Sequence, residues 1–216
     1  MERFVKFIEK QLEKLRQSVG ERLSEKRFSH TLGVERAARR IAEYFPSLDI
    51  SELSAAALLH DITKEFTLEE HYALALSQGV TLTDEQIQNR EILHSLTAPY
   101  AVAWDYPEFA SENLLSSLLN HTTACAGMSI FDEVIYIADY VEDGRSYPAC
   151  TEVRDMLFSG LKTATNDAER LSALHKATLK SLENTINKLL FQGRILNERT
   201  KEAREYILSQ LLANGD

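Results

Sequence analysis

The sequence predicts an all-α protein. Nearly every apolar segment repeats at helical period, helix-start signals recur, and no stretch alternates apolar and polar residues between hairpin turns. With 216 residues, 44% of them hydrophobic, the chain is long enough to bury a sizeable core. No internal repeat, low-complexity tract or flexible linker divides it, so a single domain is expected.

The first three helices are expected at 3–18, 24–45 and 51–60. Pro46 ends the second, and the third is short and apolar on every side, which is typical of a helix buried in the centre of a domain. The stripe of the first helix comprises Phe4, Phe7, Ile8, Leu12 and Leu15.

Later helices are indicated by their start signals. A stripe that begins at Ser129 includes 135–137, the best strand candidate, and so predicts a helix there. The last fifty or so residues predict two long amphipathic helices broken near Gly193. Capping pairs with a three-residue spacing are Thr67 with Glu70, Thr83 with Gln86 and, more loosely, Asn166 with Glu169.

Composition excludes some function classes. The net charge of −9 makes the chain a poor nucleic-acid binder, although a local basic pocket can still hold a phosphorylated ligand. No run approaches the ~18 apolar residues of a membrane span. Two cysteines, Cys125 and Cys150, and a start at 1–6 without a secretory apolar run favour a reducing cytoplasm.

The pair His60-Asp61 closes the apolar segment 51–60. Burying an imidazole and a carboxylate together costs several kcal/mol, on the order of 2–7 for a polar group, unless a partner satisfies them. A metal ion would satisfy both. The alternative is an ordinary helix end, where His60 caps carbonyls and Asp61 faces water.

The other histidines favour the metal. Asp139 is a second carboxylate among core-type residues, whereas His71 and His175 follow polar patterns and are expected at the surface. Histidines in surroundings short of charge are His30, His60, His94 and His121. All these donors are nitrogen or oxygen, which suits iron, manganese, cobalt or zinc in an open catalytic site.

Two cations stand near these groups in the sequence. Lys64 follows His60 by one helical turn, and Arg145 follows Asp139 in a polar turn. Each can hold a phosphate beside the metal. Each can equally be a solvated surface residue.

Together, these residues resemble the HD-domain superfamily of metal phosphohydrolases, and within it the bacterial symmetrical diadenosine tetraphosphatases. The similarity extends from about residue 20 to about 180. It rests on the ordered segments 27–34, 56–64, 93–101, 121–123 and 128–145.

The resemblance implies an all-α HD helical bundle at 21–185, preceded by an N-terminal helix at 1–20 and followed by a C-terminal helical extension at 186–216. It implies that the metal, usually iron, is held by His30, His60, Asp61 and Asp139. The residues implied to contact the substrate are His94, His121, Lys64, Arg27, Thr122, Gly127, Met128 and Arg145. Of these, His94 and His121 could instead hold a second metal.

The implied reaction is attack of a metal-bound hydroxide on an inner phosphorus of diadenosine tetraphosphate, giving two ADP. Asp61 and Lys64 are the expected catalytic residues, with Asp61 orienting the nucleophile. The expected partners are a nucleotide substrate and, as one explanation of the extension, a second copy of the chain in a homodimer.

The sequence departs from the family pattern after His121. Ala124-Cys125 stand where a glycine and often a basic residue are common, Gly127 is displaced, and Asp143 replaces a common proline. Three alternatives therefore stay open: an HD phosphohydrolase acting on (p)ppGpp, deoxynucleotides or monophosphates, a catalytically weak nucleotide-binding module, and a helical protein whose histidines are core residues.

Overall fold

The computed structural model describes residues 6–215, and the described chain contains helices and no strand. The α-helices are α1 (Glu9–Arg22), α2 (Glu25–Ala42), α3 (Ile50–Leu59), α4 (Leu68–Ser77), α5 (Asp84–Gln88), α6 (Leu93–Asp105), α7 (Glu112–Asn120), α8 (Ile130–Val141), α9 (Pro148–Thr163), α10 (Asp167–Phe191) and α11 (Glu198–Ala213). Two short 3-10 helices, η1 (Arg90–Ile92) and η2 (Pro107–Phe109), precede and follow α6.

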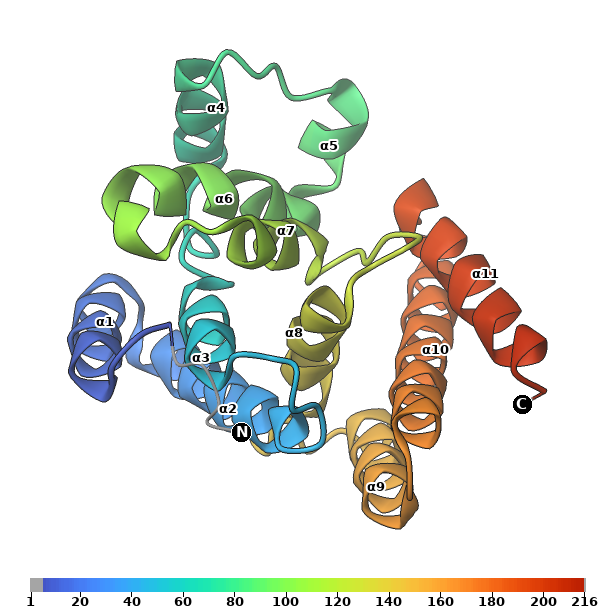
Figure 1. The fold of residues 1–216 in the computed structure, drawn as a ribbon. Coiled ribbons are helices and arrows are strands. Elements are labelled where there is room, and N and C mark those ends of the chain that lie inside the picture. The colour runs from blue at the N-terminus through green and yellow to red at the C-terminus, as the bar shows by residue number, and fades with distance from the viewer. Residues whose placement is uncertain (1–5, 216) are drawn as a thin grey trace.

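Helix α3 lies at the centre of the bundle, and α1, α2, α7 and α8 pack against it (Figure 1). Every residue from Ser51 to Leu59 is buried, as expected for a helix that is apolar on all sides. Asp49 starts this helix by accepting hydrogen bonds from the backbone N–H groups of Ser51 and Glu52. The chain leaves α3 directly into the His60-Asp61 pair, which is therefore held at the core.

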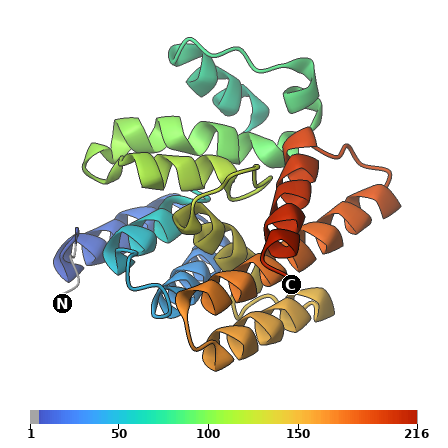
Figure 2. The same ribbon diagram turned by 45° about the vertical axis from the view of Figure 1, so that its right-hand side comes forward.

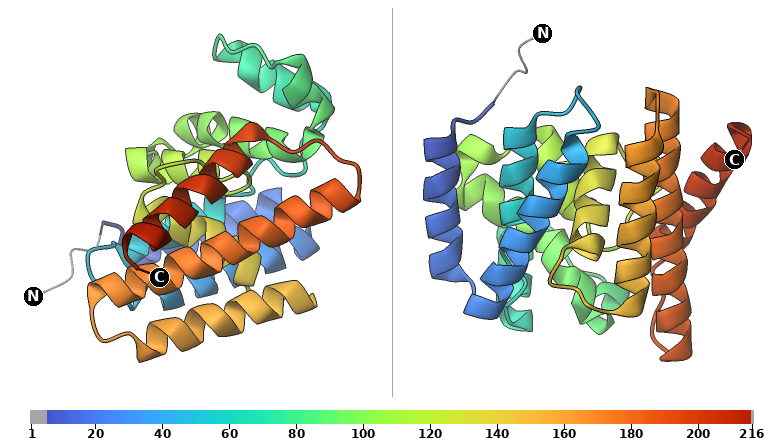
Figure 3. Two further views of the ribbon diagram at one scale, coloured as in Figure 1. Left: turned by 90° about the vertical axis from the view of Figure 1, so that its right-hand side faces the viewer. Right: turned by 90° about the horizontal axis from the view of Figure 1, so that it is seen from below.

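The C-terminal half continues the bundle. Helices α9 and α10 run side by side, α8 packs against both, and α11 lies on the outer side of α10 (Figures 2 and 3). Helices α4 and α5 stand apart at the other end, above α6 (Figure 1).

The predicted boundary of the first helix was wrong. Helix α1 begins at Glu9 instead of residue 3 and continues to Arg22, while Phe4 lies outside the described residues. Ile8 is the N-cap and is 62% exposed, so it does not belong to the buried stripe. Phe7 is buried ahead of the helix, where its N–H donates to Ser51 Oγ. Tertiary contacts with α3, invisible in local periodicity, hold this entry segment.

Most of the other predicted boundaries were confirmed. Thr67 and Thr83 make reciprocal capping boxes, and Ser129 caps a helix through 135–137. At Asn166 only half the pattern forms: its side chain accepts from the Glu169 N–H, while the Glu169 carboxylate accepts from the N–H of Thr165.

Gly193 ends α10 at the predicted position. Its φ is +62°, its N–H donates to Leu190, and the next N–H, of Arg194, donates back to Leu189. This is a Schellman arrangement, and the left-handed residue in it favours glycine. None of the described helices is both long enough and apolar enough to cross a membrane.

Candidate metal and phosphate site

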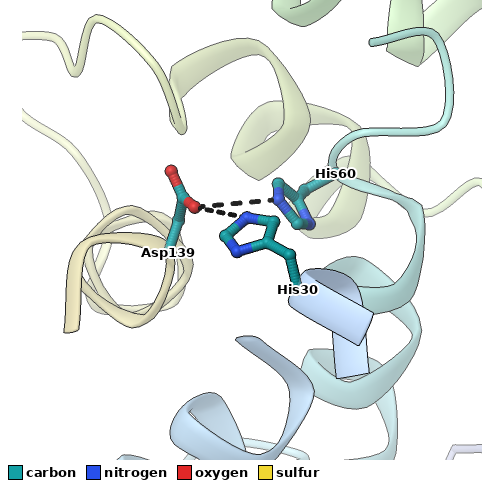
Figure 4. Close-up of side chains that lie close together, drawn as sticks. All are labelled: His30, His60 and Asp139. Atoms are coloured by element: carbon teal, nitrogen blue, oxygen red, sulfur yellow. Dashed lines mark ion pairs between the residues drawn. The ribbon is translucent and has the colours of Figure 1, made fainter. Parts of the chain in front are cut away.

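Five helices bring the predicted ligands to one place. His30 lies on α2, His60 and Asp61 directly follow α3, and Asp139 lies on α8. Figure 4 shows the Asp139 carboxylate facing the imidazoles of His30 and His60 across the centre of the bundle. His94 near the start of α6 and His121 after α7 reach the same point from the α6–α7 side.

The donor atoms converge on two overlapping groups. In the first, Asp139 Oδ1 lies 2.9 Å from His30 Nε2 and 4.0 Å from His60 Nε2. In the second, His60, Asp61 and His121 offer donor atoms within 4.8 Å of one another. Because His60 belongs to both groups, the described residues form one continuous His/Asp cluster.

The hydrogen bonds made by the outer nitrogens of the histidine rings indicate which kind of ligand this cluster fits. Nδ1 of His60 lies 2.7 Å from the carbonyl oxygen of Ala57, and Nδ1 of His121 lies 2.7 Å from that of Leu118. An N–H must donate to each carbonyl, so Nε2 carries the lone pair in the neutral ring. Nε2 of His60 and of His30 is buried without a hydrogen-bond partner beside carboxylate oxygens. Lone pairs facing carboxylates are satisfied by a cation, so these residues fit a metal ion.

The charges of the cluster are strongly coupled. Burial opposes the ionised forms of Asp61 and Asp139, but nearby His60 and Arg145 respectively outweigh it and hold both pKa values well below the usual range. Burial likewise opposes charge on His30, yet the neighbouring carboxylates of Asp139 and Glu142 raise its pKa to about 9. The buried carboxylates of this cluster therefore require positive charge beside them, which fits a site for a cation.

The imidazoles of His94 and His121, on the α6–α7 side of the cluster, are neutral. Burial lowers the pKa of His94 well below its usual value, with a further contribution from Lys64, and burial also lowers the pKa of His121. Their Nε2 atoms lie 3.0 Å apart, and Thr122 Oγ1 lies 3.0 Å from that of His94. Neutral imidazoles can each accept or donate one hydrogen bond, or coordinate a second ion.

Glu142 is a site residue to which the sequence assigned no role. Its Oε1 lies 3.2 Å from His30 Nδ1, and its Oε2 accepts from the Gly144 N–H at 2.6 Å. A carboxylate on the second nitrogen of a ligating histidine fixes the direction of the ring. A Cβ at Gly33 would overlap Glu142 Oε2, and one at Gly144 would come within 2.9 Å of it. Both glycines therefore leave open the space that this carboxylate occupies.

A cavity of about 520 Å³ opens onto the cluster. Of the predicted site residues, the cavity brings together Arg27, Asp61, Lys64, His94, His121, Thr122, Asp139 and Arg145. Gly127 and Met128 do not line it, and Met128 instead packs against the core. The C-terminal extension contributes Lys188 and Arg194 to the cavity wall, which only the tertiary arrangement reveals.

Several cations line this cavity. Arg27 Nη1 lies 2.7 Å from Asp61, and Arg145 Nη2 lies 2.5 Å from Asp139. Lys64 Nζ lies 3.1 Å from His94 Nε2, and burial lowers the pKa of this lysine. In a chain of net charge −9, this cavity is a local exception that suits an anionic ligand, because five cations line it against the three carboxylates of Asp61, Glu91 and Asp139.

The prediction that His71 and His175 are surface residues was wrong. His71 is 4% exposed, and its Nδ1 lies 2.8 Å from Thr97 Oγ1. His175 is 9% exposed, with its Nδ1 3.0 Å from the buried carboxylate of Glu133. Each polar neighbour in the sequence points elsewhere on its helix, so local composition did not report the burial of the histidine.

In the loop after His121, alanine occupies a backbone conformation that favours glycine. Ala124 is buried with a φ of +57°, the left-handed region that alanine rarely adopts. The Ala124 N–H donates to the carbonyl oxygen of Asn120, and Thr200 Oγ1 of α11 donates to that of Thr123. Contacts from the C-terminal extension therefore hold the loop in a shape that alanine disfavours.

Known proteins resemble the chain over most of its length. The HD domain model matches residues 27–144. A symmetrical bis(5'-nucleosyl)-tetraphosphatase of Staphylococcus aureus is 32% identical over 148 residues, covering 68% of this chain and 75% of that protein. The Bacillus subtilis protein of the same name is 30% identical, with 78% and 82% covered.

A solved structure shares the fold. It is a predicted HD superfamily hydrolase involved in NAD metabolism from Clostridium acetobutylicum, 32% identical, with a TM-score of 0.77 over 92% of this chain and 97% of that one. The matched HD region contains the whole His/Asp cluster, from His30 to Asp139. The chain therefore belongs to the HD-domain family and, within it, to the group of the symmetrical bis(5'-nucleosyl)-tetraphosphatases.

Proposed function

We propose that this protein is a metal-dependent hydrolase that cleaves diadenosine tetraphosphate symmetrically into two ADP. The observation that carries the proposal is the His/Asp cluster at the base of a cavity lined by arginines and lysines. A polyphosphate bridge is the anionic part of this substrate, and cations beside a metal offset its charge. The names of the relatives supply the substrate.

The proposed ligands are His30, His60, Asp61 and Asp139, and iron is the proposed metal. A bound transition metal supplies Lewis acidity and a water ligand of lowered pKa at neutral pH. The nitrogen and oxygen donors suit iron, and they suit manganese, cobalt and zinc equally well. Elemental analysis of protein purified without chelator decides among them.

The side chains of this protein would divide the remaining work. Asp61 orients the attacking water or accepts its proton, because its Oδ2 faces His30 and His60 while its Oδ1 faces His94 and His121. Arg27, Lys64 and Arg145 bind phosphate oxygens, as their positions on the cavity wall support. Thr122 and the neutral His94 and His121 hydrogen-bond the transferred phosphoryl group. Gly127 and Met128 remain predictions without such support.

The test is a hydrolysis panel with product identification on metal-loaded protein. The expected result is ADP as the single nucleotide product of diadenosine tetraphosphate. Formation of AMP and ATP would contradict symmetrical cleavage. Hydrolysis of monophosphates or (p)ppGpp with diadenosine tetraphosphate left intact would favour the other HD-type activities, and tight binding without turnover under every divalent metal would favour a binding module.

We also propose that 21–185 form the HD domain and that 186–216 are an extension packed on it, after the N-terminal segment 1–20. Support for the extension comes from the Arg199 guanidinium, which donates to Asn120 Oδ1 at 2.6 Å. The free Cys125 and Cys150 agree with a reducing cytoplasm. A homodimer stays a prediction, to be checked by light scattering.

A further inference from the structure

A second cavity of about 320 Å³ lies next to the first. Lys64, Glu91 and His94 line both cavities, so their side chains form the partition between them. Beyond this partition, two elements wall the second cavity. They are the start of α4, which Figure 1 shows above α6, and η1, which directly precedes α6 in the chain. Its volume reaches the lower end, about 300 Å³, of small-molecule sites.

The lining of this second cavity combines an apolar and a cationic side. Phe66, Leu68 and Leu93 form the apolar side. Arg90 and Lys64 form the cationic side, and the exposed Arg90 guanidinium makes no ion pair or hydrogen bond with any described residue. An aromatic face beside a free guanidinium is the combination that binds a base and a phosphate of one nucleotide.

His71 holds the aromatic wall of the second cavity, the ring of Phe66, in place. Its ring contacts that of Phe66, with centroids 5.7 Å apart, and its Nδ1 is engaged by Thr97. Thr97 is itself fixed to the backbone of α6 through the carbonyl oxygen of Leu93. Phe66 therefore rests on a buried, hydrogen-bonded support that the cluster chemistry does not use.

The reaction requires space on both sides of the attacked phosphorus. A symmetrical dinucleotide carries a nucleoside at each end, and in-line displacement sends the leaving oxygen away from the nucleophile. The first cavity, of about 520 Å³, extends from the cluster toward α10 and offers space for one nucleotide half of such a substrate. The partition of Lys64 and His94 lies beside Asp61, with His94 Nε2 3.3 Å from its Oδ1, so the other half leaves the cluster on this side.

We propose that the second cavity is the subsite for the other nucleotide half of the substrate, with Phe66 against its base and Arg90 on its phosphate. The inference rests on the proposed function for the identity of the substrate. It assigns a specificity role to the α4–η1 region: preference for a dinucleotide over a mononucleoside polyphosphate resides there.

Kinetics test the aromatic wall. Phe66→Ala is expected to lower kcat/KM for diadenosine tetraphosphate at least tenfold while leaving hydrolysis of adenosine 5'-tetraphosphate, which lacks the second nucleoside, within twofold. Tyr72→Ala, an exposed aromatic of α4 outside the cavity, is the matched control and should change neither rate. Equal effects of Phe66→Ala on both substrates, or no effect on either, would overturn the subsite.

Calorimetry with ADP gives a second readout that needs no turnover. Metal-loaded protein is expected to bind two ADP per chain, and Arg90→Glu to bind one, while Arg36, exposed and without an ion pair to any described residue, supplies the control Arg36→Glu. Arg36→Glu should still bind two, and one ADP in the unmodified protein, or two in Arg90→Glu, would contradict the proposal. If diadenosine tetraphosphate is not cleaved at all, the proposed function fails, and the ADP stoichiometry still decides the subsite.

Discussion

Gly33 and Glu142 occupy adjoining space, although 109 positions separate them in the sequence. Gly33 lies on α2 one turn after His30, and the missing side chain leaves the room that the Glu142 carboxylate fills. That carboxylate in turn hydrogen-bonds the outer nitrogen of His30. A helical glycine, usually unfavourable by roughly 1 kcal/mol relative to alanine, is explained here by the site it permits.

Gly33→Ala is therefore expected to displace Glu142 and to weaken metal binding about 10- to 100-fold, the usual effect of losing a group that orients a ligand. Metal content after dialysis against a weak chelator measures it. Gly20→Ala on α1 is the control, because a Cβ there meets only the ring of Phe28. Retention of the full metal affinity in Gly33→Ala would show that Glu142 does not orient His30.

His60→Ala and Asp139→Ala are expected to abolish metal binding, since each removes a donor from the centre of the cluster. His175→Ala is the informative contrast. It strips the buried Glu133 of its partner and should lower the free energy of unfolding by about 1–3 kcal/mol without reducing metal content per folded chain. Urea unfolding and elemental analysis on the same samples separate the two effects, and metal loss in His175→Ala would contradict the assignment.

Lys64→Ala is expected to lower kcat/KM about 10- to 100-fold with an unchanged metal content. The reason is that a charged hydrogen bond to phosphate contributes roughly 1.5–3 kcal/mol, and ~1.4 kcal/mol corresponds to a factor of ten. Steady-state kinetics with Lys162→Ala, a lysine on the exposed side of α9, provides the comparison. An unaltered rate in Lys64→Ala would leave this residue as a wall of the cavity only.

Ala124 gives a prediction about stability. Replacing it by glycine relieves about 1–2 kcal/mol of left-handed strain, but removes a buried methyl worth ~0.8 kcal/mol and adds ~0.4–1 kcal/mol of unfolded-chain freedom. The free energy of unfolding should therefore change by less than about 1 kcal/mol. Ala124→Val, which adds β-branching at positive φ in a buried place, should lose more than about 2 kcal/mol. A neutral valine would show that the loop can relax.

Local patterns were sufficient for most of the helices, although not for the start of the first one. Helix α3 was predictable because an apolar run needs no knowledge of its neighbours, and α10 because Gly193 ends it by backbone geometry alone. Asp61, Asp139 and four histidines became candidates because a polar side chain among core residues requires a partner, and the resemblance to the HD superfamily selected His30, His60, Asp61 and Asp139 among them.

Only the tertiary structure decided which distant residues share the site. Glu142 against Gly33, Lys188 and Arg194 on the cavity wall, and the burial of His71 all depend on contacts between helices remote in sequence. Periodicity reports which face of a helix is apolar, but not which surface that face meets. For that reason the sequence determined the fold class and the metal-site chemistry, whereas helix packing determined the shape and cationic lining of the substrate cavity.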